Sequence, residues 1–95
     1  MLEINCQNLL DLVYHLQIVS EDGLLGKNAN KFVNKCSNFK SSITVSYAYK
    51  TVNAKSILAV LYLGATQYSF IEITISGTDE ELAHDVIIEF LTDNL

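Results

Sequence analysis

The sequence predicts an α+β fold, an open-faced two-layer sandwich of a four-stranded antiparallel sheet with three helices on one face. Some segments have apolar residues at every second position, which is the pattern of a strand with one buried face. Others have apolar residues three and four positions apart, which is the pattern of an amphipathic helix. The order of these segments is β-α-β-β-α-β-α. A sheet with one apolar face needs helices to bury that face, so the patterns favour two layers.

Four segments have strand character. The clearest is the last, in which Ile71, Ile73 and Ile75 alternate with mostly polar residues. The second and third segments are joined by a link too short for a parallel crossover, so we expect them to pair antiparallel. The strands are predicted over residues 13–19, 41–49, 50–53 and 68–76.

Two longer segments are predicted to be amphipathic helices. The first spans about residues 26–40, and the other follows Gly77. Thr78 and Glu81 have the spacing of a capping box, which predicts that Thr78 caps the second of these helices. The buried stripes are predicted to be Ala29, Phe32, Val33 and Cys36 in the first, and Leu82, Ala83, Val86, Ile87 and Phe90 in the second.

A short helix is predicted after Ser56, and it is apolar almost all round. A two-layer fold buries only one side of a helix, so some of these side chains should be exposed. One interpretation is that the helix is wedged between loops and mostly buried. The other is that Leu58, Leu61 and Tyr62 form an exposed patch for docking a partner protein, since soluble monomers seldom expose such patches without a use.

Length and charge exclude several classes of protein. With 95 residues the chain has room for one core, and we expect residues 13–95 to form one domain preceded by an extension, residues 1–12. A net charge of −5 argues against nucleic acid and anionic membranes as partners, and the chain has no long uncharged apolar run, so we expect a cytoplasmic protein. Cys6 and Cys36 are expected to be reduced thiols. No zinc-type spacing of cysteine and histidine is present, and neither a metal nor a cofactor is expected.

The segments TVNAKSI (51–57), LG (63–64) and GTDEELA (77–83) resemble the HPr family, the small phosphocarrier proteins of the bacterial sugar phosphotransferase system. The resemblance runs from about Tyr14 to Leu91 and implies the same open-faced sandwich. In the family, a histidine in the segment His-Ala-Arg-Pro-Ala carries phosphate between enzymes. Here that position is Leu25, and Lys27 and Asn28 stand at the arginine and proline positions.

Leucine has no lone pair that accepts a phosphoryl group, so the sequence predicts that this chain is not a histidine phosphocarrier. Neither His15 nor His84 occupies the phosphocarrier position, and we interpret both as ordinary surface or half-buried histidines. No catalytic residue is predicted, and the chain is not expected to be an enzyme.

The resemblance implies a regulatory site at Ser56. In many family members the matching serine is phosphorylated by the HPr kinase/phosphorylase, and the modified protein regulates carbon metabolism, notably as corepressor of a sugar-responsive transcription factor. The alternative is that Ser56 only caps the following helix, since serine is among the preferred N-cap residues. The predicted docking residues are Leu58, Leu61, Tyr62 and Lys27.

Two function classes follow. The first is a non-catalytic HPr-like regulator that is similar to HPr homologues lacking the histidine and keeping the serine, and that acts on a transcription regulator or a metabolic enzyme. The second is a scaffold or oligomerisation module that has lost both phosphorylations. The extension is too apolar for a free tail, so we expect it to pack on its own domain or to form a homodimer by pairing with a sheet edge of a second copy.

Overall fold

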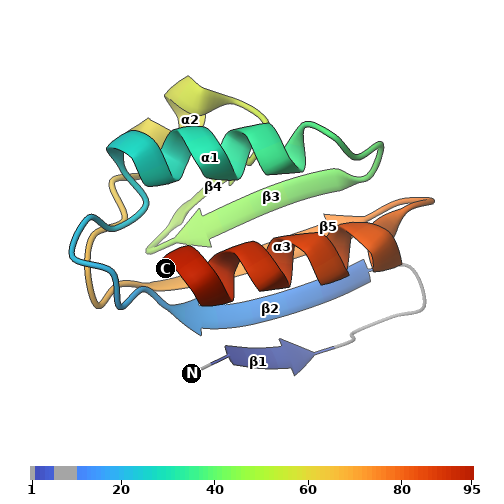
Figure 1. Cartoon of the computed structure of the whole chain (residues 1–95), viewed down its shortest axis with the longest axis horizontal. Helices are drawn as coiled ribbons and strands as arrows, with labels where there is room; N and C mark the ends of the chain where they lie inside the picture. Colours follow the sequence, from blue (N-terminus) through green and yellow to red (C-terminus); the bar gives the residue numbers. More distant parts are fainter. Residues whose placement is uncertain (1, 6–10) are drawn as a thin grey trace.

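The computed structural model describes the backbone of residues 2–5 and 11–95 and the side chains of residues 13–95. Its sheet is antiparallel throughout and has the strand order β1-β2-β5-β3-β4 (Figure 1). The strands are β1 (Leu2–Asn5), β2 (Asp11–Gln17), β3 (Ser42–Tyr47), β4 (Lys50–Asn53) and β5 (Phe70–Ser76). The predicted four-stranded sheet is thus confirmed, and β1 adds a further strand beside β2 of the same chain.

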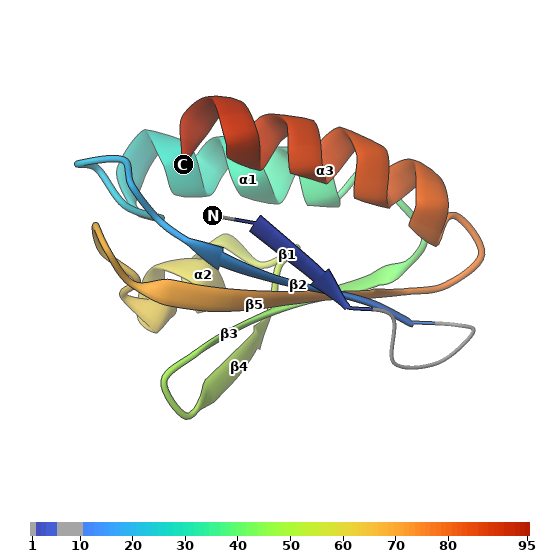
Figure 2. The same cartoon turned by 90° about the horizontal axis from the view of Figure 1, so that it is seen from below.

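Three helices complete the fold: α1 (Gly26–Cys36), α2 (Ile57–Leu63) and α3 (Glu80–Asn94). Figure 2 shows α1 and α3 side by side across one face of the sheet, with the other face of the sheet uncovered by helices. The short helix α2 packs against α1 and β4. None of the described helices is long and apolar enough to cross a membrane.

The core lies between the sheet and the layer of α1 and α3. Alternate residues of the central strands point into it, which follows from the period-2 pattern of the sequence. Ile73 at the centre of β5 is fully buried, so truncation of its side chain to alanine should cost about 2–5 kcal/mol. The predicted stripe of α1 is confirmed as buried: Ala29, Phe32, Val33 and Cys36.

Several predicted boundaries differ from the structure. α1 ends at Cys36 and not near Lys40, because the next N–H groups, of Asn38 and Phe39, donate to carbonyls three residues back and no longer four. β5 begins at Phe70 and not at residue 68, because Tyr68 has a φ of 70°, which no strand residue adopts.

The predicted capping box at the start of α3 is wrong. The helix begins at Glu80, after Asp79, and has no side-chain cap. The Asp79 carboxylate instead accepts hydrogen bonds from the backbone N–H groups of Lys40 and Ser41, each at 2.8 Å, and from the Ser41 hydroxyl. The start of α3 is therefore fixed by a tertiary contact to the segment before β3.

The predicted buried stripe of α3 is wrong at Leu82, which is 60% exposed. The buried residues of this helix are Ala83, Ile87, Phe90 and Leu91. Adjacent residues of an α-helix are about 100° apart around its axis, so Leu82 falls outside the side that Ala83 and Ile87 turn to the sheet. Val86 is partly buried against the core.

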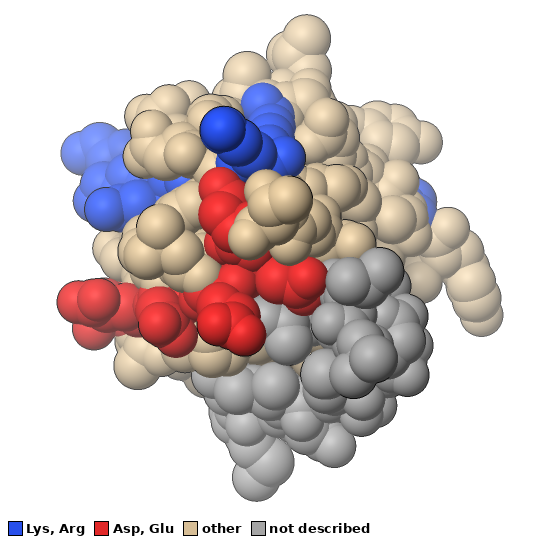
Figure 3. Space-filling view, turned by 90° about the vertical axis from the view of Figure 1, so that its right-hand side faces the viewer, with Lys and Arg blue, Asp and Glu red and all other residues tan. Residues whose placement is uncertain are grey.

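Charge is unevenly divided between α1 and α3. Within its bounds α1 carries three lysines and no acidic residue, whereas α3 carries five acidic residues and no lysine or arginine. Figure 3 shows a group of lysine side chains above a band of acidic side chains at the left of the view. The two helices therefore give the helical face a basic half and an acidic half.

Candidate functional site

The loop between β2 and α1 contains the position at which the sequence resemblance leads us to expect the phosphocarrier histidine. Gly23 has a φ of 63°, and a Cβ atom there would lie 2.8 Å from the Ala65 carbonyl oxygen, so only glycine fits. The Leu24 N–H donates to the same carbonyl at 2.9 Å, and the Leu24 side chain is buried. The loop is thereby anchored to the segment that follows α2.

Leu25 stands at the start of α1 with an extended backbone and a half-buried side chain. It lines an open hollow of about 410 Å³ together with Asp22, Gly26 and Lys27. None of these four residues is a histidine: the Leu25 side chain has no lone pair, and the only cation among them is the exposed Lys27. The hollow therefore contains no imidazole that accepts a phosphoryl group.

Asn28, in the first turn of α1, faces inward. Its side-chain amide donates to the Gly23 carbonyl at 2.9 Å and to the Ser20 hydroxyl at 3.4 Å, and the residue is buried. These bonds hold the loop closed against the first turn of α1. Asn28 thus has a structural role that the sequence did not indicate, because its partners are set by the path of the loop.

Ser56 is the N-cap of α2. Its backbone is extended, and its hydroxyl oxygen accepts a hydrogen bond from the Ala59 N–H at 3.4 Å. The side chain is half-buried. Lys55 turns away from it, since its ammonium group donates to the Phe39 carbonyl at 2.6 Å. Lys55 therefore ties α2 to the segment after α1 and does not bond to Ser56.

The two sides of α2 have different environments. Val60 and Leu63 are fully buried, whereas Leu58 and Tyr62 are 78% and 70% exposed and Leu61 is 40% exposed. We refer to Leu58, Leu61 and Tyr62 as the α2 patch. The patch begins two residues after Ser56, so a chemical modification of the serine would lie next to an apolar surface.

Lys50 is a neighbour of the α2 patch that the sequence did not reveal. Its ammonium lies 4.9 Å from the centroid of the Tyr62 ring and 3.4 Å from the Leu63 carbonyl oxygen, to which it donates. A cation over an aromatic face is attracted by the ring quadrupole. This lysine comes from β4, so no spacing within the sequence could have indicated the contact.

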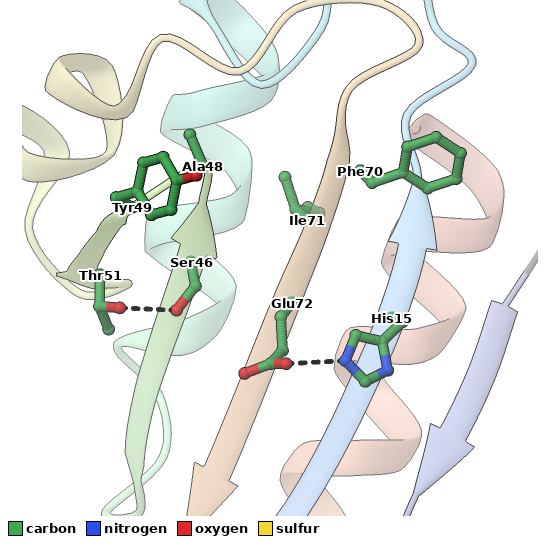
Figure 4. A pocket seen from close by; sticks show the side chains of 8 residues that line it. All are labelled: His15, Ser46, Ala48, Tyr49, Thr51, Phe70, Ile71 and Glu72. Carbon is green, nitrogen blue, oxygen red and sulfur yellow. Dashed lines mark hydrogen bonds and ion pairs between the residues drawn. The ribbon is translucent and has the colours of Figure 1, made fainter.

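Neither histidine lies in the loop before α1. His15 is on the uncovered sheet face, where its Nε2 lies 2.7 Å from Glu72 Oε2. Figure 4 shows the two side chains pointing toward each other, next to a Ser46–Thr51 hydroxyl pair, in an open hollow of about 490 Å³. His84 is on α3, where its Nδ1 lies 2.9 Å from Asp85 Oδ1.

Cysteine thiols and clusters of metal-binding side chains are the remaining candidates for chemistry. Cys36 is fully buried, and burial raises the pKa of its thiol to about 12, with nearby Lys55 opposing part of that rise, so the thiol is protonated at neutral pH. Cys6 lies outside the described residues. Among the residues that the structure describes, no three histidine, cysteine or acidic side chains come together as metal ligands.

Comparison with known proteins agrees with this architecture. The family model described as "PTS HPr component phosphorylation site" matches residues 14–93. The phosphocarrier protein HPr of Xylella fastidiosa (strain Temecula1) is 36% identical over 78 residues, which cover 82% of this chain and 88% of that protein. The crystal structure of HPr-C-His from Thermoanaerobacter tengcongensis superposes with a TM-score of 0.82 at 32% identity and covers 85% of this chain and 91% of that one.

A further structure is more distant. Bacillus subtilis Crh, described as a catabolite repression containing protein that forms a domain-swapped dimer, gives a TM-score of 0.62 at 24% identity, covering 84% of this chain and 92% of that one. At that identity the likeness concerns the fold alone.

The antiparallel sheet, its layer of helices and the anchored loop before α1 define an open-faced sandwich of the phosphocarrier class. The chain belongs to the HPr family. Proteins of this family carry phosphoryl groups for other enzymes and are not catalysts themselves.

Proposed function

We propose that this chain is a non-catalytic HPr-like regulator of carbon metabolism that is phosphorylated on Ser56 and acts through protein contacts. The proposal is supported by the leucine at position 25, where the family resemblance expects the phosphocarrier histidine, and by Ser56, which opens α2 next to the exposed α2 patch. The first feature removes histidine phosphotransfer. The second leaves a modifiable hydroxyl beside a surface suited to a partner.

A phosphate on Ser56 changes this surface electrostatically. It adds a charge of about −1.5 to −2 at neutral pH, next to a helix whose first turn has no acidic residue. The new charge lies next to the apolar side chains of the α2 patch. It therefore favours partners with a basic group beside an apolar pocket and disfavours acidic ones.

The kinase expected to modify Ser56 is the HPr kinase/phosphorylase, and the expected target is a sugar-responsive transcription regulator or a metabolic enzyme. These partners come from the family resemblance. The proposed contacts are the three residues of the α2 patch, together with Lys27 at the start of α1.

The decisive experiment is a kinase assay read by intact mass. The protein is incubated with ATP and an HPr kinase/phosphorylase, alongside Ser56→Ala and, as the matched control, Ser42→Ala at an exposed serine of β3. We expect one added phosphoryl group on the unchanged chain and on Ser42→Ala, and none on Ser56→Ala. An unmodified parent protein, or a modified Ser56→Ala variant, would contradict the proposal.

The alternative is a scaffold or oligomerisation module that has lost both phosphorylations. The bond from the Ala59 N–H to Ser56 favours it, because capping alone explains a serine at this position. Under this alternative the kinase leaves the chain unmodified.

A further inference from the structure

The exposed sides of α1 and α3 carry opposite charges at the same spacing. Lys27, Lys31 and Lys35 form a basic row on α1, four residues apart. The acidic row on α3 has the same spacing and consists of Glu81, Asp85 and Glu89. All six side chains are exposed. Residues four apart lie on one side of a helix, so each row is about 12 Å long.

Among the described residues the lysines of the basic row form no ion pair, and in the acidic row Asp85 is paired with the neighbouring His84. Like charges four residues apart destabilise a helix, so both rows carry repulsion that a partner of opposite charge relieves. The same side of α3 also exposes Leu82, an apolar side chain of the kind found inside interfaces.

We propose that the two rows bind a second copy of this chain. α1 and α3 lie side by side and run in opposite directions (Figure 1). In the proposed dimer the helical faces of the two copies pack against each other. The two-fold axis lies between these faces and is parallel to the helices. The basic row of each copy then faces the acidic row of the other. Each contact then occurs twice, as in any isologous dimer. Figure 3 shows lysine side chains next to acidic side chains at the left of the view, so both signs of charge occur on this side of the molecule.

Charge complementarity selects this occupant. A merely acidic partner would satisfy the basic row and repel the acidic row, and a basic partner would do the reverse. A second copy satisfies both with matched lengths and antiparallel direction. The contact is polar and exposed at its rim, so we expect a weak dimer that depends strongly on salt.

The test is sedimentation equilibrium of the full chain at about 0.01 M and about 1 M salt, where the screening length is about 30 Å and about 3 Å. We expect dimers at low salt that dissociate at high salt. Lys31→Glu and Asp85→Lys should each weaken the dimer about tenfold, and the double variant should restore it. Glu81→Lys tests the acidic row without touching the bond between Asp85 and His84.

The Asp85→Lys variant also distinguishes specific contacts between the two rows from an effect of the net charge of the chain. It makes this acidic chain less negative, so simple repulsion between molecules would fall and association would strengthen, whereas the proposal expects it to weaken. Leu58→Gln with Leu61→Gln should leave the dimer unchanged, which distinguishes this interface from the α2 patch. A chain that is monomeric at low salt, or single charge reversals without effect, would overturn the proposal.

Discussion

The Asp79 carboxylate accepts a hydrogen bond from the backbone N–H of Ser41 at 2.8 Å, across 38 positions of the chain. The Ser41 hydroxyl and the Lys40 N–H donate to the same carboxylate. This carboxylate joins the start of α3 to the segment that enters β3. Gly77 lies against Ser41 as well, since a Cβ atom on it would be 2.7 Å from the Ser41 Cα.

These bonds make part of the stability depend on pH. The Ser41 hydroxyl bond, and then the Lys40 N–H bond, lower the pKa of Asp79 from 3.8 to about 2. A carboxyl whose pKa is lower in the folded state stabilises the fold above its unfolded pKa and loses that contribution as pH falls. We expect stability to decline between pH 4 and pH 2, and Asp79→Asn to make that decline shallower. Urea unfolding at several pH values measures this, and parallel curves for both proteins would contradict it.

Phosphoenolpyruvate and the general phosphotransferase enzyme should not phosphorylate this protein. Leu25 lacks the imidazole that accepts the phosphoryl group, and His15 and His84 lie on other elements. The check is intact mass at neutral and acidic pH, because phosphohistidine is labile in acid. Leu25→His is the informative companion, since it tests whether Lys27 and the inward-facing Asn28 still permit transfer. An acid-labile phosphate on the unchanged chain would contradict this prediction.

Leu58→Gln combined with Leu61→Gln should change the free energy of unfolding by less than about 1 kcal/mol. Both side chains are exposed, and glutamine is a good helix former. The matched control is Leu63→Ala in the same helix, where a fully buried side chain is removed at a cost of about 2–5 kcal/mol. Thermal and urea unfolding of the three proteins give the comparison. A large loss in the glutamine variant would mean that the α2 patch is structural.

Ala48→Gly should stabilise the protein by up to about 1 kcal/mol. Ala48 lies in the turn between β3 and β4 with a φ of 56°, a conformation that costs an L-residue about 1–2 kcal/mol and costs glycine little. The greater freedom of glycine in the unfolded chain offsets part of this gain. Ala59→Gly inside α2 is the control, and there the same substitution should destabilise by about 1 kcal/mol. Thermal midpoints shifted in the same direction would refute the strain argument.

Local pattern was sufficient for most of the fold. Alternation in residues 68–76 predicted the central strand, and the helical spacing of Ala29, Phe32, Val33 and Cys36 predicted the buried side of α1. These succeed because strand and helix periodicities are properties of neighbouring residues. The serine cap of α2 was predictable for the same reason, as its partner is only three residues away.

Tertiary structure decided what depends on residues far apart in the sequence. Asp79 bonds to Ser41 and leaves the predicted capping box of Thr78 unformed, Lys55 reaches Phe39, and Lys50 lies over Tyr62. The sequence shows that each of these side chains can donate or accept, but its choice of partner depends on which groups the packed chain brings within about 3 Å. Likewise the sequence left open whether the apolar helix α2 is buried. Packing against α1 and β4 covers Val60 and Leu63 and leaves Leu58 and Tyr62 exposed, because a helix at the edge of a two-layer fold has only one side to bury.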